Sequence, residues 1–561
     1  MAQGNYEGIS VREAMERINA MNNGWFLPII QRQYVWGSRD SSEEYICLLL
    51  DSLLRGYPIG GLVLWETESA IPYREFLKDY KIGAVTHIVA EGRWGAHKFL
   101  VYDGQQRLQT LYSVLYHRFN GRKLYFNLLF DAKNSEVDET GFYFKSSNEE
   151  SKKLELEIAE LSSCSISNKY AMRRKLLASV ELSDQEKELA ETNFDNLWDV
   201  FVGTDKKSIA YFPVRSNTPE EVNEVFRRLN TGGMQLTQLE MVLAKIKEHS
   251  PYFEEELWDL SHEIEKATGG TPGIVFSAHE IVQLLYLMRF DTTRVDESKV
   301  TTPSAEAPIF QRLLNAAKEV LPNFFKLFFY EGLHINAKWL IIRQQAILPM
   351  LAYCMALHEK SFKWKLEQIN TKPFFTYFIK SQLCDWNTQT MVTAFSRLAK
   401  QMAYQNKPFP LFEITQIAHD KNRMTEITYS QFCGQLWFAL KMLTPGRTYL
   451  FNERTPQIDH IFPKALRKGT PDAESYKQKV DIIWNMQPTP AGINRQKWDE
   501  DPVQYFKSDK GKPFLSSYDF LPESLESKEW ENEDSFIAFR KGKMESFLQE
   551  RYGISLQKDP E

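Results

Sequence analysis

The alternation of hydrophobic and polar positions predicts a mixed α/β region at the start of the chain. The segment from Tyr45 to Leu54 has a helical pattern, and Gly56 is placed to end that helix. The apolar run Gly61–Trp65 is typical of a buried strand. We therefore expect a helix followed by a strand within the first 65 residues.

A second apolar run, Lys98–Tyr102, predicts another strand, which leads into the polar segment 103–107. Beyond that segment the apolar residues recur at helical spacing, at Leu108, Leu111, Tyr112 and Leu115. The predicted order is strand, polar turn, helix. Such a turn places the free N–H groups of a helix start next to the end of a strand.

Two capped helices are predicted further along the chain. Thr218 and Pro219 have the residue types of a helix start, and that helix ends at the segment 230–233. Thr237 and Glu240 then have the spacing of a capping box for the next helix.

The remainder of the chain is predicted to be mainly helical up to a boundary at Pro445-Gly446. Residues 250–440 are helical in character and rich in aromatic residues, and the tail 511–561 contains one amphipathic helix with Phe536, Phe539 and Phe547. We therefore expect a multidomain α+β protein with an α/β N-terminal domain over 1–249, a helical connecting domain over 250–440 and a C-terminal domain over 441–561.

Composition narrows the class of protein. The chain has 561 residues, of which 43% are hydrophobic and 25% charged, an ordinary globular balance. It has no run of 18 uncharged apolar residues, no apolar leader at its N-terminus and five scattered cysteines without a CxxC pair. These features predict a cytoplasmic protein with neither a membrane partner nor a disulfide framework.

The segment 457–463, Gln-Ile-Asp-His-Ile-Phe-Pro, carries candidate catalytic chemistry. Asp459 and His460 are expected at the end of a strand, Asn485 follows about 25 residues on, and Asn494 and Lys497 form an Asn-x-x-Lys pattern. A neutral histidine can take the proton of a water that attacks a phosphodiester. The oxygens of Asp459 and Asn494 suit a hard divalent cation, and Asn485 is expected to hold the imidazole or its loop.

Local charge is consistent with a phosphate-binding surface in the same region. Residues 441–497 contain ten Lys or Arg and five Asp or Glu, a net charge of 10 − 5 = +5 in a chain of net charge −6. A solvated surface is the alternative explanation of this charge.

The N-terminal region carries three further polar motifs: residues 31–36, Gln-Arg-Gln-Tyr-Val-Trp; residues 103–107, Asp-Gly-Gln-Gln-Arg; and residues 226–233, which include Asn230. Gly104 permits a tight turn before a helix start that offers N–H groups to an anion. Arg32 and Arg107 add forked donors for phosphate, and Asp103 could bind a metal or polarise a water. Core packing is the alternative for Tyr34 and Trp36.

Together these motifs resemble the GmrSD-type modification-dependent (type IV) restriction endonucleases, over roughly residues 8–250 and 441–508. The resemblance implies a ParB/sulfiredoxin-like N-terminal domain and a ββα-metal (HNH, His-Me finger) nuclease domain that cleaves or nicks double-stranded, modified phage DNA in antiviral defence. Glucosylated and phosphorothioate DNA are both recognised in the family. The implied cofactors are Mg²⁺ or Mn²⁺ and an NTP such as GTP, and a homodimer is compatible with the resemblance.

The resemblance also assigns roles to residues. The catalytic residues would be His460, Asp459, Asn485 and Asn494, with Asp459 and Asn494 as metal ligands and Lys464, Arg495 and Lys497 as DNA contacts. Nucleotide binding would fall to Asp103, Gly104, Gln105, Gln106, Arg107, Gln31, Arg32 and Asn230, and sensing of the DNA modification to Tyr34 and Trp36. Gln109 stands where the motif usually has Thr, and a Walker A motif is absent, so nucleotide use rests on the resemblance alone.

Two other functions remain open. One is an NTPase switch whose nuclease domain is inactive. The other is a ParB-like DNA-binding module with a helical adaptor and no catalytic activity, which would leave the C-terminal constellation unexplained.

Overall fold

The computed structural model describes residues 5–31, 33–34, 41–69, 71–82, 84–89, 97–135, 139–146, 149–215, 222, 237–270, 273–360, 370–451, 456–490, 497 and 499–559. The chain forms two compact units, Met1–Tyr252 and Phe253–Glu561. The first unit ends close to the predicted boundary at residue 249. The regions 250–440 and 441–561, predicted as separate domains, belong almost entirely to one compact unit.

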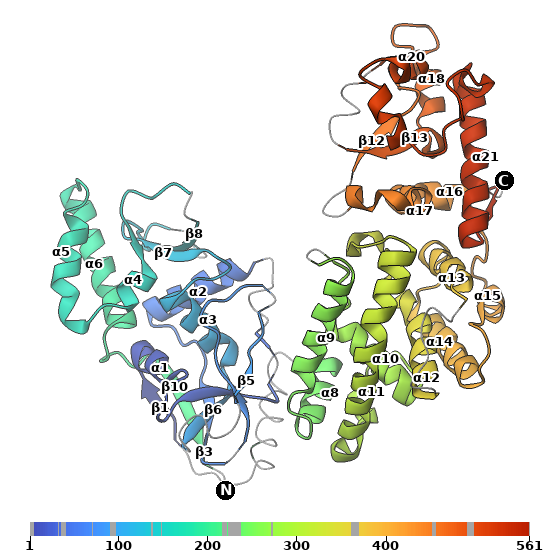
Figure 1. Ribbon diagram of the computed structural model, residues 1–561. Helices are drawn as coiled ribbons and strands as arrows, with labels where there is room; N and C mark the ends of the chain where they lie inside the picture. The colour runs from blue at the N-terminus through green and yellow to red at the C-terminus, as the bar shows by residue number, and fades with distance from the viewer. Residues whose placement is uncertain are drawn as a thin grey trace. The chain divides into compact units, whose positions relative to one another are not determined.

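The first unit contains a mixed sheet, with α2 (Ser42–Arg55) and α3 (Gln105–Tyr116) beside it (Figure 1). Within the described residues its strand order is β1-β10-β3-β6-β2-β4-β5. The β3 strand runs antiparallel to β6 and parallel to β10, and β6 runs parallel to β2. The two strands predicted near 61–65 and 98–102 are therefore confirmed and lie side by side. The strands are β1 (Glu7–Ile9), β2 (Trp25–Pro28), β3 (Leu62–Thr67), β4 (Tyr73–Arg74), β5 (Ile88–Val89), β6 (Lys98–Asp103) and β10 (Ile209–Val214).

Both faces of this sheet are buried, because alternate residues of β3 and β6 enter two different apolar clusters. Leu64 and Val101 belong to the larger cluster, and their strand neighbours Trp65 and Leu100 belong to the smaller one. The helix α3 (Gln105–Tyr116) packs Leu108, Leu111 and Leu115 into the larger cluster. The predicted strand–turn–helix unit is thus anchored in the core through both of its elements.

The other helices of the first unit begin and end largely where their capping residues predict. Gly56, whose φ of 75° is left-handed, is the C-cap of α2, and Thr237 is the N-cap of α8, with Glu240 completing a capping box. The helix predicted from Thr218 lies outside the described residues except for residue 222. A separate sheet has the order β8-β7-β9. These elements are α1 (Val11–Arg17), α2 (Ser42–Arg55), β7 (Lys123–Asn127), β8 (Phe142–Lys145), β9 (Glu155–Glu157), α4 (Ile158–Ser162), α5 (Lys169–Leu177), α6 (Asp184–Phe201) and α8 (Gln238–Lys247).

The second unit begins with a helical region, as the sequence predicts. Within it α12 packs against α10, α11 and α14 around a core rich in phenylalanine. No described helix of the chain is both long enough and apolar enough to span a membrane. The helices are α9 (Phe253–Ala267), α10 (Ala278–Phe290), α11 (Pro303–Phe324), α12 (Leu348–Lys360), α13 (Lys372–Leu383), α14 (Gln389–Tyr404), α15 (Leu411–Asp420), α16 (Tyr429–Gly434) and α17 (Leu436–Leu443).

The C-terminal part of the second unit is a β-hairpin surrounded by short helices, with its own apolar cluster that includes Phe462 and Phe536. The long helix α21 contributes Phe536 to this cluster, and at its other end the Tyr552 hydroxyl donates to the carbonyl of Met442 at 3.1 Å. This helix therefore joins the hairpin region to the helical region. The elements are β11 (Ile427–Thr428), β12 (Gln457–His460), α18 (Ala473–Val480), β13 (Met486–Thr489), α20 (Pro502–Lys507), α21 (Glu533–Tyr552) and β14 (Leu556–Gln557), of which β11 and β14 pair in parallel.

Candidate functional site

The β12–β13 hairpin positions the two central residues of the predicted nuclease site. Asp459 and His460 are the last two residues of β12, as the sequence predicts. In the antiparallel register Asp459 lies opposite Gln487, and His460 lies opposite Met486. Successive side chains of a strand point to opposite faces, so the two residues enter different surroundings.

His460 forms a pair with a carboxylate that the sequence did not single out. Its Nε2 lies 3.0 Å from Oδ1 of Asp481, which follows α18, and the other oxygen of Asp481 lies 2.6 Å from Nζ of Lys464. The imidazole is mostly buried, with 18% of its side chain exposed. Lys464, predicted to contact DNA, is partly exposed. It forms an ion pair with Asp481, the carboxylate that also contacts His460.

Electrostatics determine which nitrogen of His460 carries the proton. Burial opposes ionisation of Asp481, but the hydrogen bonds from Lys464 and His460 outweigh it and hold the pKa of Asp481 below its usual value. An ionised carboxylate only accepts hydrogen bonds, so Nε2 of His460 is the donor. Burial, helped by the charge of Lys464, lowers the pKa of His460 in spite of Asp481, so the ring is neutral near pH 7. Nδ1 then holds the lone pair that can accept a proton.

Asp459 is almost fully buried and is held by two donors on one oxygen. Its Oδ2 accepts hydrogen bonds from Lys497 Nζ at 2.8 Å and from the Tyr518 hydroxyl at 2.8 Å. Lys497 also donates to the carbonyl of His460 at 2.7 Å and is itself 1% exposed. This placement corrects the expectation that Lys497 contacts DNA, because its ammonium is buried against Asp459 and the end of β12.

Asn485 holds the loop that follows β12. Its Oδ1 accepts from the backbone N–H of Phe462 at 2.9 Å, and its Nδ2 donates to the carbonyls of Phe462 and Val480 at 2.9 and 2.8 Å. The side chain is fully buried, so all three bonds are shielded from water. Of the two roles expected for Asn485, this geometry matches the positioning of the loop.

The structure therefore gathers Asp459, His460, Asn485 and Lys497 at one hairpin and adds Asp481 and Tyr518. Asn494 and Arg495 lie outside the described residues. The only sequence signal for Asp481 was its position four residues before Asn485, and Tyr518 carried no signal that would separate it from other tyrosines.

The donors around Asp459 are compatible with the divalent cation that the resemblance implies. In the described part of the chain, Oδ1 of Asp459 has no hydrogen-bond partner, whereas Oδ2 has two. Mg²⁺ commonly binds through one or two carboxylates, with water and substrate phosphate completing its shell. Among the described residues no group of three or more His, Cys, Asp or Glu side chains could hold a metal ion.

The Asp-Gly-Gln-Gln-Arg motif of the first unit forms the predicted turn between β6 and α3. Gly104 is the N-cap of α3 with φ of 86°, a left-handed conformation that favours glycine. A Cβ at this position would lie 2.1 Å from Cδ2 of Leu62, which is buried in β3. Glycine is therefore required both by the backbone and by the close approach of β3.

Replacing Gly104 by alanine is expected to destabilise the first unit through both effects. Gly121 provides a matched control, because its φ of 80° is similar and, among the described residues, no atom lies within 4 Å of the point that a Cβ would occupy. Gly121→Ala carries only the backbone cost, whereas Gly104→Ala should cost about 1–3 kcal/mol more from the clash with Leu62. Urea unfolding of the two variants measures this difference, and equal losses would show that the approach of β3 is not tight.

The three glutamines of this region form hydrogen bonds within the protein. Gln31 donates to the carbonyl of Tyr102 at 2.6 Å and accepts from Gln105 Nε2 at 2.8 Å. Gln106 donates to the carbonyl of Gln33 at 3.3 Å. All three glutamines, which were predicted to bind nucleotide, are buried. Their hydrogen bonds stabilise the turn, and they expose little surface to a ligand.

Arg107 and Asp103 lie at the outer side of the same turn. Arg107 donates to the carbonyls of Ile59 and Gly61 and contacts Asp103 at 3.3 Å. The Asp103 side chain is 53% exposed, against 16% for Arg107. Asp103 is thus the member of the motif most open to a ligand. Arg32, Trp36 and Asn230 lie outside the described residues.

Tyr34 does not lie where DNA could reach it. Its hydroxyl is 2.6 Å from Oγ1 of Thr110, and its ring packs edge-to-face on Tyr80 with centroids 4.7 Å apart. Burial raises its pKa well above the usual value. This position corrects the expectation of a DNA-sensing role for Tyr34 and matches the alternative of core packing.

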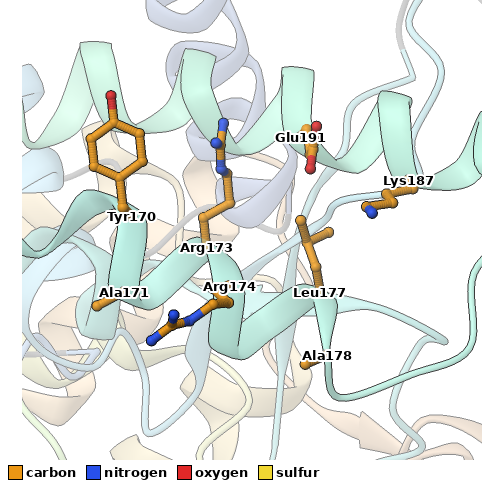
Figure 2. Close-up of a pocket in the computed structure, with 8 residues that line it drawn as sticks. All are labelled: Tyr170, Ala171, Arg173, Arg174, Leu177, Ala178, Lys187 and Glu191. Atoms are coloured by element: carbon orange, nitrogen blue, oxygen red, sulfur yellow. The ribbon is translucent and has the colours of Figure 1, made fainter.

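A surface pocket between α5 and α6 contains none of the predicted site residues (Figure 2). Its lining carries both signs of charge, and Arg173 is already paired with Asp195 at 2.8 Å. We therefore assign the pocket to neither candidate site. It is lined by Tyr170, Ala171, Arg173, Arg174, Leu177, Ala178, Lys187 and Glu191.

Fold and sites together define a multidomain α+β protein with two polar centres, one in each compact unit. Comparison with known families gives the class of the first unit. Residues 15–247 match the family described as GmrSD restriction endonuclease, N-terminal domain. No curated protein matches the chain.

Proposed function

We propose that the protein is a metal-dependent DNA endonuclease of the ββα-metal type, regulated by its GmrSD-type N-terminal domain. The observation that carries the proposal is the contact of 3.0 Å between His460 Nε2 and the Asp481 carboxylate, on the residue that follows the buried Asp459 in β12. The GmrSD family of the first unit supports DNA as the substrate.

In this mechanism the residues of the chain divide the tasks of phosphodiester hydrolysis. Nδ1 of His460 accepts the proton of the attacking water while Nε2 stays bonded to Asp481, which stabilises the positive charge that the ring acquires. Asn485 fixes the loop after β12, and Asp459 would hold Mg²⁺ or Mn²⁺ together with Asn494. A bound divalent cation supplies Lewis-acid stabilisation of charge on the phosphate and the leaving oxygen.

We further propose that the first unit binds an NTP such as GTP and responds to modified phage DNA, glucosylated or phosphorothioate. Asp103 is half exposed where β6 leads into the start of α3, and a helix start is a place where phosphate commonly binds. A ligand there changes cutting only if it binds the competent and resting states with different affinity. Coupling of about 1–3 kcal/mol would alter the rate by roughly 5–150-fold.

Cleavage of matched plasmids tests the proposal. Unmodified, glucosylated and phosphorothioate DNA are each incubated with the full chain, with and without Mg²⁺ or Mn²⁺ and with and without NTP. We expect nicked or linear product from at least one DNA only when metal is present, and complete loss on adding EDTA. NTP hydrolysis without cutting would favour the NTPase switch, and tight DNA binding without either activity would favour the binding module.

A further inference from the structure

The carboxylate of Asp459 is held from a part of the chain that the sequence marked only as a tail. Tyr518 lies 59 residues beyond Asp459, and its hydroxyl donates to Oδ2 from within the buried interior. Its ring packs edge-to-face on Phe506 with centroids 4.9 Å apart. Both the position and the direction of the hydroxyl are thus fixed by packing.

The residue next to Tyr518 fastens this segment to the hairpin. The backbone N–H of Asp519 donates to Oε1 of Gln487 at 3.1 Å, and its carboxylate accepts from Gln487 Nε2 at 2.9 Å. Gln487 is the residue directly opposite Asp459 in the hairpin. The segment that carries Tyr518 is therefore attached to the hairpin at the position opposite Asp459.

A buried arginine of α21 completes the support. Arg540 is fully buried and donates to the carbonyls of Met486 and Asp519 and to Oε1 of Gln487. It thereby joins α21, β13 and the segment that carries Tyr518. A carboxylate accepts at both oxygens, so saturating Oδ2 with Tyr518 and Lys497 leaves Oδ1 as the oxygen available to a cation.

We propose that Tyr518 is a positioning residue that orients Asp459 for a divalent cation, which makes the segment 518–540 an integral part of the proposed nuclease site. The inference rests on the proposed function, since it takes Asp459 as the metal ligand. Hydroxyl-to-carboxylate bonds of this kind are short and charge-assisted, and loss of such an outer partner typically weakens metal binding about 10–100-fold.

The test is direct measurement of Mn²⁺ binding to the full chain without DNA, by electron paramagnetic resonance of free Mn²⁺. Tyr518→Phe keeps the ring and removes only the hydroxyl. We expect its dissociation constant for Mn²⁺ to rise about 10-fold or more, and Asp459→Asn to remove the site. In a parallel cutting assay, a higher metal concentration should restore the rate of Tyr518→Phe, which a merely unfolded variant would not show.

Tyr476→Phe is the matched control, because Tyr476 is buried in the same apolar cluster and its hydroxyl has no hydrogen-bond partner in the described structure. It should bind Mn²⁺ like the unchanged protein. An unchanged dissociation constant in Tyr518→Phe, or an equal increase in both variants, would overturn the role of Tyr518 while leaving the nuclease proposal intact. Absence of Mn²⁺ binding and of cutting in the unchanged protein would overturn both.

Discussion

His460→Ala is expected to reduce metal-dependent DNA cutting by about 10²–10⁴-fold, the usual contribution of a general base. The variant removes an imidazole whose Nε2 lies 3.0 Å from Asp481 Oδ1 and whose pKa is lowered by burial, which favours a neutral ring with Nδ1 as the proton acceptor. The measurement is the rate of plasmid nicking under single-turnover conditions with saturating Mg²⁺. NTP hydrolysis and the unfolding midpoint should remain close to those of the unchanged protein.

His419→Ala provides the matched control for this experiment. His419 lies in α15 of the same compact unit and is largely exposed, and its ring is close to the carboxylate of Asp420. It should cut like the unchanged protein. If His460→Ala cuts at the unchanged rate with either Mg²⁺ or Mn²⁺, a different group takes the proton of the water.

The elements that carry the two sites could be predicted because their patterns are local. The strand at 98–102, the turn at Gly104 and the helix stripe at Leu108, Leu111 and Leu115 each depend on residues a few positions apart, and all are present in the structure. The placement of Asp459 and His460 at the end of a strand followed from the same short-range pattern.

The partners of these residues could not be predicted, because they depend on long-range packing. Asp481 is one of many carboxylates in the C-terminal region, and only the fold places its Oδ1 3.0 Å from Nε2 of His460. Tyr518 lies 59 residues beyond Asp459 in the sequence. The direction in which a side chain points cannot be predicted from the sequence either. Lys497 and Tyr34 have residue types that suit DNA contact and were assigned such roles, but both are buried.

In the Asp-Gly-Gln-Gln-Arg motif, too, the directions of the side chains could not be predicted from the residue types. Its residue types suggested that every polar member faces a ligand, yet Gln105 and Gln106 bond to the protein interior and Arg107 bonds to two backbone carbonyls. A motif of this kind first builds its own turn, and only Asp103 keeps substantial exposure. Tests of nucleotide binding are therefore best directed at Asp103.

Asp481→Asn is expected to slow cutting on the order of 10²-fold or more, although it changes a single atom outside the predicted motif. Lys464 is a donor only, so the amide oxygen of the introduced asparagine would turn toward its ammonium, which lies 2.6 Å from Asp481 Oδ2 in the unchanged protein. The amide NH₂ would then face Nε2 of His460. That nitrogen would have to accept, which places the proton on Nδ1 and removes the lone pair that takes the proton of the water.

A reversed tautomer of His460 and the simple loss of its contact with Asp481 predict different effects for asparagine and alanine at position 481. Asp481→Ala leaves Nε2 free to keep its proton, so asparagine at this position should be at least as damaging as alanine, despite being the closer match in shape. Asp534→Asn is the control. Asp534 is an exposed carboxylate of the same unit that pairs, like Asp481, with a lysine, in this case Lys479 at 2.6 Å. It should cut normally. Single-turnover nicking rates of the three variants decide the matter: if Asp481→Asn cuts within twofold of the unchanged protein, Asp481 does not set the tautomer of His460.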